Sequence, residues 1–108
     1  MSEHGNSFSN QNPHHLYVVE DTTENKVFKY GISDDPIEED GLSKRLRQQV
    51  DFLNRAVGFL RFLGSVLLTN IQGRRKAKEI EDKYIDNYID AYGERPRGNP
   101  IGGKKHKK

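Results

Sequence analysis

The sequence lacks cysteine and tryptophan and has no long run of apolar residues. Without cysteine, the chain can form neither a disulfide framework nor a zinc site with thiolate ligands. No apolar run approaches the roughly 18 residues of a membrane-spanning helix. The polar, acidic N-terminal segment also lacks the apolar centre of a signal peptide. We therefore expect no membrane span and no cleavable leader.

A formal net charge of only +2 argues against a strongly basic nucleic-acid-binding protein, but the charge is unevenly distributed. Residues 1–40 contain two basic and nine acidic residues, whereas residues 41–108 contain 16 basic and seven acidic residues. Attraction of a charged partner depends on the local field rather than on the total. The C-terminal two thirds of the chain can therefore still attract a polyanion.

Hydrophobic patterning predicts three strands in a chain whose 108 residues suit a single domain. Short runs rich in β-branched and aromatic residues at 15–20 and 26–32 predict two strands joined by a turn. The densest apolar run, at 59–71, suits a central strand, although periodicity alone leaves a buried helix open.

Two amphipathic segments predict helices. Residues 43–56 carry apolar residues on one side, with Ser43 placed to cap the start of the helix and Gly58 to end it. Residues 72–92 show the same period and are followed by Gly93, a natural residue at a helix end. The order β-β-α-β-α predicts an α/β protein of the α+β type, with one small three-stranded sheet flanked by helices.

The polar segments at the two ends do not belong to the predicted core. Residues 1–14 are rich in Ser and Asn and predict a flexible lead-in, and the basic residues 101–108 predict a mobile tail. The folded domain is therefore expected to span 15–100.

Helix 43–56 places polar side chains where core residues are expected. On a helical wheel, Arg45 and Gln49 fall on or inside the apolar stripe, whereas Lys44 and Arg47 point to solvent. Arg45 either buries its aliphatic stem and keeps its charge in water, or serves a functional site.

Glu81 conflicts more sharply with its predicted position. It falls in the middle of the apolar stripe of helix 72–92, whereas Asp82 and Asp86 fall on the opposite face. A carboxylate is rarely buried unless it is paired or binds a metal. Glu81 therefore either forms a salt bridge with an arginine such as Arg45, or is a ligand for a hard cation such as Mg²⁺.

The tyrosines and histidines are less informative. Tyr17 and Tyr30 lie on neighbouring predicted strands and can present two hydroxyl groups to one cleft. The tyrosines of helix 72–92 are interpreted as packing residues. The four histidines lie in the tails or at a strand end without metal-ligand spacing, and we expect them to be solvated.

Read in order, these residues match a known pattern, which lies in the segments His15–Val19, Lys29–Ser33, Arg45–Leu46, Ala77–Glu81 and Asn99–Pro100. The pattern resembles the GIY-YIG nuclease domain. That family has a small three-stranded antiparallel sheet flanked by helices. Its motifs are a first-strand tyrosine, a second-strand Tyr-x-Gly-x-Ser/Thr, an arginine that opens the first helix, a later helical glutamate and a downstream asparagine.

Three positions depart from the family pattern. When Gly31 is matched to the family glycine, Lys29 takes the place of the second tyrosine, and Tyr30 follows on the opposite face of the strand. Either a change of register presents Tyr30 or Lys29 takes over part of its role. The first motif keeps only its tyrosine, and Gln49 stands where many relatives have a histidine.

The resemblance implies phosphodiester hydrolysis by a metal-dependent endonuclease. Glu81 would hold one Mg²⁺ or Mn²⁺ ion, and Arg45 would place a fixed positive charge on the phosphate. Tyr17 would take the proton of the attacking water. Tyr30 or Lys29 would orient the water or the phosphate.

Asn99 would fix the C-terminal segment or contact a substrate oxygen, and the alternative is a turn residue before Pro100. Six basic residues would contact the nucleic-acid backbone, or alternatively form an ordinary solvated face: Arg47, Arg74, Arg75, Lys76, Arg95 and Arg97.

Variants with Lys-Tyr-Gly-Ile-Ser resemble the C-terminal nuclease domains of bacterial polymorphic toxins. This resemblance implies a toxin that acts in the bacterial cytoplasm after delivery into a competing cell, with DNA favoured over RNA as target and a cognate immunity protein as partner. Three alternatives remain: a DNA repair or mobile-element nuclease, a catalytically idle nucleic-acid-binding module, and a protein-interaction domain that uses the acidic loop 34–40.

Overall fold

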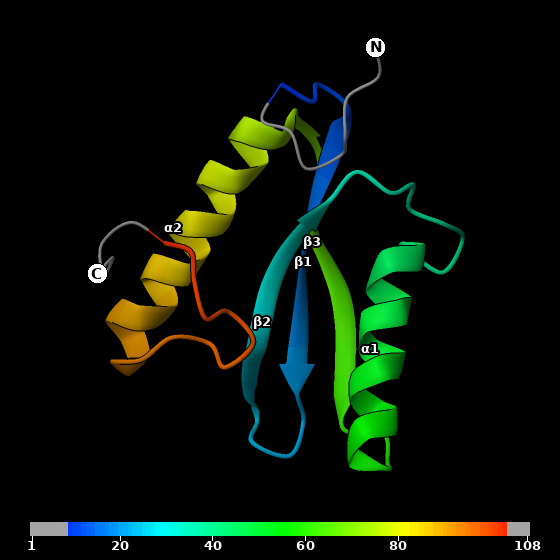
Figure 1. Ribbon diagram of the computed structural model, residues 1–108, viewed down its shortest axis with the longest axis vertical. Coiled ribbons are helices and arrows are strands. Elements are labelled where there is room, and N and C mark those ends of the chain that lie inside the picture. Colours follow the sequence, from blue (N-terminus) through cyan, green and yellow to red (C-terminus); the bar gives the residue numbers. More distant parts are fainter. Residues whose placement is uncertain (1–8, 104–108) are drawn as a thin grey trace.

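The computed structural model describes residues 9–103, which form three strands and two helices (Figure 1). In chain order these are β1 (Pro13–Asp21), β2 (Lys26–Ser33), α1 (Lys44–Val57), β3 (Phe62–Gln72) and α2 (Arg74–Tyr92). The predicted order β-β-α-β-α and the α+β class are thereby confirmed. Residues 1–8 of the predicted lead-in and 104–108 of the predicted tail lie outside the described residues.

The three strands form one antiparallel sheet in the order β2-β1-β3. β1 is therefore the central strand, and its residues 14–19 are all buried. The prediction that the apolar run at 59–71 is central was wrong, because β3 pairs only with β1 and lies at an edge of the sheet. Its Leu63 and Leu67 are exposed, so the abundance of apolar residues did not indicate burial here.

The two helices pack on opposite faces of the sheet, and the alternation of side chains along β1 separates the core into two clusters. Leu16 faces α2 and packs with Ile32, Ile71 and Ala77. Tyr17 faces α1 and joins a second cluster with Val19, Leu46 and Phe62. Residues 16–19 of β1 and their partners 29–32 of β2 therefore alternate between the α1 side and the α2 side. Beyond the register shift after Val19, Phe28 of β2 also packs on the α1 side.

Helix α1 begins and ends where its sequence predicts. The hydroxyl oxygen of Ser43 accepts a hydrogen bond from the backbone N–H of Leu46 at 3.2 Å. Gly58 has a left-handed backbone with φ 85°, and its N–H donates to the carbonyl of Asn54. In the part of the chain that the structure describes, neither helix is long and apolar enough to cross a membrane.

The chain returns along α2 after its C-terminal end, as the orange and red segment of Figure 1 shows. The backbone N–H of Gly103 donates to Oδ1 of Asp82 at 2.8 Å. This return covers Asp82 and Asp86, both buried, so the sequence-based placement of these two carboxylates in solvent was wrong. At the other end, the carbonyl of Asn10 accepts a hydrogen bond from the N–H of Arg74 at the start of α2.

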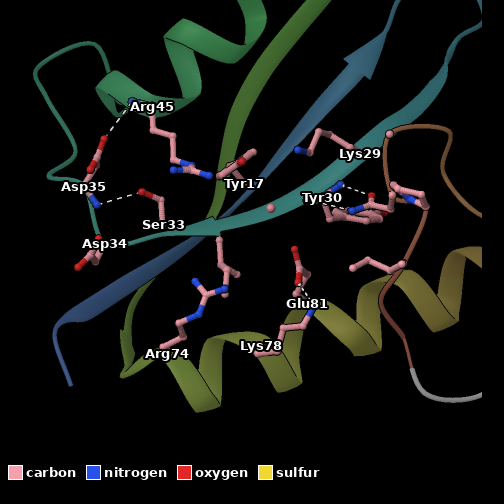
Figure 2. Close-up of a pocket in the computed structure, with 16 residues that line it drawn as sticks. Tyr17, Lys29, Tyr30, Ser33, Asp34, Asp35, Arg45, Arg74, Lys78 and Glu81 are labelled. Carbon is pink, nitrogen blue, oxygen red and sulfur yellow. Dashed lines mark hydrogen bonds and ion pairs between the residues drawn. The ribbon is translucent and has the colours of Figure 1, made fainter. Parts of the chain in front are cut away.

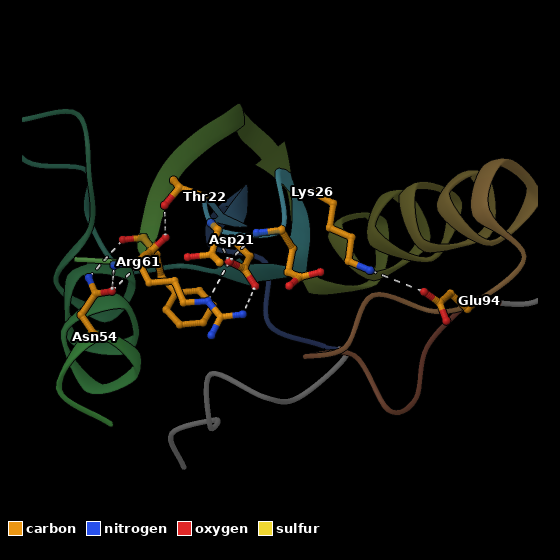
Figure 3. A network of polar contacts seen from close by, with 9 residues as sticks. Asp21, Thr22, Lys26, Asn54, Arg61 and Glu94 are labelled. Atoms are coloured by element: carbon orange, nitrogen blue, oxygen red, sulfur yellow. Dashed lines mark hydrogen bonds and ion pairs between the residues drawn. The ribbon is translucent and has the colours of Figure 1, made fainter. Parts of the chain in front are cut away.

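A partly buried ion pair joins the end of β1 to the start of β3, and Asn54 of α1 is hydrogen-bonded to the same segment (Figure 3). Nε and Nη2 of Arg61 each donate to one carboxylate oxygen of Asp21 at 2.8 Å. The Oδ1 atom of Asn54 accepts from the backbone N–H groups of Arg61 and Phe62. These contacts fix the end of the sheet that lies away from the cleft described below.

Candidate active site

A cleft of about 630 Å³ lies at the β2 edge of the sheet and reaches from α1 to α2 (Figure 2). Its walls come from both helices, from β1 and β2, and from residues 98–101 of the returning segment. All six sequence-predicted catalytic residues line it: Tyr17, Lys29, Tyr30, Arg45, Glu81 and Asn99. Residues up to 82 positions apart in the sequence therefore meet at one site.

Tyr17 is held at the floor of the cleft by the central strand, with only 2% of its surface exposed. It faces Gly31 directly across the β1–β2 ladder, and a Cβ atom at residue 31 would overlap the phenol ring. Burial raises the pKa of the Tyr17 hydroxyl, while hydrogen bonds from Arg45 and Gln49 and the charge of Arg45 oppose that rise. The hydroxyl thus lies beside a positive charge that favours its deprotonated form.

Arg45 lies in the first turn of α1 and points toward Tyr17 in Figure 2. Its own backbone N–H donates to Oδ2 of Asp35 at 3.1 Å, which fixes the start of the helix at the cleft. Within residues 9–103, no carboxylate forms an ion pair with its guanidinium group. The charge of Arg45 is therefore available to an anion in the cleft.

The register of β2 places Lys29 and Tyr30 on opposite faces of the sheet. Lys29 pairs with Val19 and Gly31 pairs with Tyr17, so Lys29 faces the α1 side together with Tyr17. Tyr30 faces the α2 side, where its ring centroid lies 5.4 Å from that of Tyr84. The register is regular at these positions, and it gives Lys29 the place beside Tyr17.

Both side chains have perturbed acidity. Burial lowers the pKa of the Lys29 ammonium; the charge of Glu81 opposes this shift, and the charge of Arg45 adds to it. Burial raises the pKa of the Tyr30 hydroxyl. Of the two, Lys29 is thus the group whose proton is held less tightly than usual.

Glu81 is 7% exposed and enters the cleft from α2. Its partner is Lys78, three residues earlier on the same helix, whose Nζ lies 2.8 Å from Oε1. The salt bridge to Arg45 that the sequence left open does not occur, because α1 and α2 lie on opposite faces of the sheet. Burial alone would lower the pKa of Lys78, but the hydrogen bond and charge of Glu81 outweigh it and the pKa is raised.

Three acids line the cleft, Asp34, Asp35 and Glu81. Asp34 and Asp35 accept hydrogen bonds from Asn12 and from the backbone of Arg45, so Glu81 is the candidate metal ligand. Among residues 9–103, no group of three or more histidine, aspartate or glutamate side chains is arranged to hold a metal. Mg²⁺ is commonly held by one or two carboxylates together with water and substrate phosphates. Glu81 fits that mode when the ion displaces the ammonium group of Lys78 from its carboxylate.

Asn99 holds the returning segment against β2. Its Oδ1 accepts from the N–H of Tyr30 at 2.8 Å, and its Nδ2 donates to the carbonyl of Tyr30 at 3.0 Å. The neighbouring Gly98 donates to the carbonyl of Phe28 at 2.7 Å. The amide of Asn99 thus acts as a ladder partner for the edge strand, and its own N–H closes a turn on the carbonyl of Pro96.

The six basic residues expected to contact nucleic acid are not gathered at one place. Arg74 lines the cleft, and Figure 2 shows its side chain reaching toward β2. Arg47 instead forms ion pairs with Glu38 and Asp40 of the acidic loop. Nη1 of Arg95 donates to the carbonyl of Gly102 at 2.7 Å. The remaining three lie outside the lining of the cleft: Arg75, Lys76 and Arg97.

The acidic loop 34–40 is largely engaged within the domain. Besides the pairs with Arg47, Oδ2 of Asp34 accepts from the side-chain amides of Asn10 and Asn12, both at 3.1 Å. Asp35 holds the start of α1, as described above. These contacts tie the loop to the rest of the domain, although residues 36–40 remain exposed.

Sequence reasoning missed Lys78 and the burial of two histidines. Lys78 precedes Glu81 by three positions, a spacing that places both on one helix face and was a usable signal. His14 and His15 are each only 2% exposed, so their expected solvation was wrong. They belong to the first strand, which becomes the centre of the sheet, and only the strand order reveals their burial.

Comparison with known protein families identifies a relationship for most of the chain. A family model described as URI fold toxin 2 matches residues 7–93, which include both strands and both helices that carry Tyr17, Lys29, Arg45 and Glu81. No curated protein and no solved structure matches the chain.

Proposed function

Because the chain belongs to the URI fold toxin 2 family, a family of toxin domains with a URI nuclease-like fold, we propose that it is a metal-dependent endonuclease of the GIY-YIG kind. The observation that carries this proposal is the convergence of Tyr17, Arg45 and Glu81 on one cleft from three different elements. Phosphodiester hydrolysis needs a base for the attacking water and positive charge on the phosphate. Tyr17, Arg45 and a cation held by Glu81 can supply them.

In this proposal the positive charges of the cleft bind the scissile phosphate. Arg45 offers a planar, bidentate donor set that matches two phosphate oxygens, and Arg74 adds a second cation at the α2 side. Lys29 of β2 is a third cation in the lining. Negative charge that develops on the phosphate is thus met by groups already fixed before reaction.

Tyr17 is proposed to accept the proton of the attacking water. A tyrosine hydroxyl has an ordinary pKa of about 10, so at neutral pH only a small fraction of it is the phenolate that can accept a proton. Arg45 favours the ionised form, while burial opposes it. Lys29 is the competing candidate, since it shares the face of Tyr17 and has a lowered pKa. Tyr30, which packs against Tyr84, is proposed to support the α2 wall.

Glu81 is proposed to hold Mg²⁺ or Mn²⁺. When bound, such an ion would polarise the phosphate and stabilise the leaving oxygen. Lys78 would keep Glu81 oriented toward the cleft until the ion binds. Asn99 keeps the edge of β2 and the returning segment in place and acts as a positioning residue.

The toxin family favours this interpretation over a repair or mobile-element nuclease. We propose that the domain acts on nucleic acid, with DNA as the first substrate to test, in the cytoplasm of a bacterial cell into which it is delivered. An immunity protein that blocks the cleft would protect the producing cell.

A catalytically idle nucleic-acid-binding module is the second candidate. Two observations favour it: the ammonium of Lys78 already occupies one oxygen of Glu81, and Lys29 replaces the second tyrosine of the resembled motif. Such a module would bind the phosphate backbone through Arg45 and Arg74 without cutting it.

A nicking assay separates the two candidates. Supercoiled plasmid DNA and a structured RNA are each incubated with the protein in Mg²⁺ and in EDTA. We expect cleavage in Mg²⁺ only, lost in Glu81→Gln and retained in Glu79→Gln, a matched change at an exposed acid on the same helix. Salt-sensitive binding without cleavage of either substrate would instead favour the idle module.

Expression in bacteria tests the toxin assignment of the site. The wild type should arrest growth, and Glu81→Gln should relieve the arrest at equal protein level. If Glu81→Gln remains as toxic as the wild type, the toxicity does not come from this cleft.

A further inference from the structure

A second groove of about 530 Å³ adjoins the cleft on the α1 side. The two share three wall residues, Lys29, Arg45 and Gly98, so the groove continues the cleft between β2 and α1. Its other walls are the apolar side chains of Phe28, Phe52 and Leu53 and the amides of Gln48 and Gln49. A ligand bound in the cleft therefore has an apolar compartment directly beside it.

Phe52 is the side chain in this groove that folding does not explain. It is 71% exposed, and it does not belong to the cluster that packs α1 on the sheet. Phe28 differs, because its ring packs against Phe62 of the core with centroids 5.0 Å apart. An aromatic ring left in water beside Arg45 and Lys29 is available to a ligand.

The charges of the groove indicate the chemistry of that ligand. Two of its walls, Lys29 and Arg45, are cationic, and none of its wall residues is a carboxylate. Phe52 lies seven positions after Arg45 in α1, which is about 10 Å along the helix axis. The occupant thus has an anionic group at the Arg45 end and a flat apolar group at the Phe52 end.

We propose that the groove binds an unpaired nucleobase next to the phosphate held in the cleft, with the base stacked on Phe52. Every nucleobase offers an aromatic face for such stacking. The amides of Gln48 and Gln49 provide donors and acceptors for the edge of the base. A base inside a duplex must leave its stack to enter the groove, so the preferred substrate is a single strand, a loop or another unpaired segment.

This inference rests on the proposed function and is tested by binding, without cleavage. Each protein carries Glu81→Ala and is kept in EDTA. Fluorescence titration then measures its affinity for DNA and RNA oligonucleotides that contain one 2-aminopurine, as a single strand and as a matched duplex. The variants are Phe52→Ala, Phe52→Tyr, which keeps an aromatic ring, and Phe59→Ala, which removes another exposed phenylalanine of the chain outside both cavities.

We expect Phe52→Ala to weaken single-strand binding about tenfold, within the range measured for base–aromatic stacking. Phe52→Tyr and Phe59→Ala should bind as the parent protein does. Duplex binding should be weaker and should not respond to Phe52→Ala. Unchanged single-strand binding in Phe52→Ala, or an equal loss for strand and duplex, would overturn the inference and leave the groove to a protein partner.

Cleavage by the protein without the Glu81 change is measured separately. If it cuts nucleic acid but Phe52→Ala cuts single strands as well as the parent does, the nucleobase site is wrong while the proposed function stands. If no substrate is cut but binding depends on Phe52, the proposed function is wrong and the groove belongs to a binding module.

Discussion

Gly31 stands directly opposite Tyr17 in the β1–β2 ladder, and the space of its missing side chain is filled by the phenol ring. A Cβ atom at residue 31 would lie 2.6 Å from Cε1 of Tyr17 and closer still to Cζ and the hydroxyl oxygen. The tyrosine of the first motif and the glycine of the second are thus two parts of one packing arrangement. The glycine fixes where the candidate base lies in the cleft.

We therefore expect Gly31→Ala to displace Tyr17 and to lower cleavage at least about 100-fold, as misplacement of a catalytic group by an ångström does. Overpacking should also destabilise the fold by about 1–3 kcal/mol. A double-mutant cycle with Tyr17→Ala checks the cause by urea denaturation. The loss in free energy of unfolding caused by Gly31→Ala should largely vanish in the Tyr17→Ala background. If the losses of the two single variants simply add in the double variant, the clash is contradicted.

The dependence of cleavage on pH identifies the proton acceptor. Burial raises the pKa of Tyr17, so if Tyr17 is the base, log kcat/KM rises through neutral pH without levelling off below about pH 10. Burial lowers the pKa of Lys29, so a lysine base would give an earlier plateau. Cleavage rates from pH 6 to 10 for the wild type and Lys29→Met decide between them. A plateau that Lys29→Met abolishes would reassign the role.

Lys78 competes with the proposed metal for Glu81, since its Nζ lies 2.8 Å from Oε1. Lys78→Met should lower the Mn²⁺ concentration for half-maximal cleavage about three- to tenfold, as expected for the loss of a partly solvated charge-assisted hydrogen bond. Lys83→Met removes an exposed lysine of the same helix and should leave this concentration unchanged. A rise in the concentration for Lys78→Met would show that Lys78 supports metal binding.

Asp21 and Arg61 stabilise the fold away from the cleft, and this contribution depends on pH. The hydrogen bonds from Arg61 hold the pKa of Asp21 below its ordinary value, so the pair stabilises the native state most fully above the unfolded pKa of about 4. The contribution is lost as the pH falls through the lower native pKa. Asp21→Asn should lower Tm by at least about 5 °C at pH 7.

The difference in Tm between the wild type and Asp21→Asn should narrow below pH 4, because the wild-type carboxylate then becomes protonated as well. Thermal scans by circular dichroism between pH 3 and 7 measure it. Cleavage at 25 °C should be little affected, since Asp21 does not line the cleft. A difference that stays constant down to pH 3 would contradict the assigned cause.

The elements and several site residues could be predicted from local sequence because local physics determines them. Ser43 caps α1 because its hydroxyl reaches Leu46, and Gly58 ends the helix because it adopts a left-handed backbone. The position of Glu81 on an apolar helix face followed from the period of the helix alone. Helix capping and helix periodicity depend only on residues that are close in sequence, so they can be predicted without the fold.

The strand order could not be predicted, and several errors follow from that. An apolar run such as 59–71 favours a strand, but its burial depends on how many strands pair with it. β3 became an edge and β1 the centre, which left Leu63 exposed and buried His14 and His15. The return of the chain along α2 buried Asp82 in the same way, through a contact with Gly103 that is distant in sequence.

The five elements, the uneven charge and the residues whose polarity conflicts with a core can all be found in the printed sequence. Their partners became visible only in the folded chain: Lys78 rather than Arg45 for Glu81, the backbone of Tyr30 for Asn99, and the acidic loop for Arg47. Helix and strand periods can be predicted because they depend on neighbours in sequence. A partner depends on the packing of elements, which a single sequence does not specify.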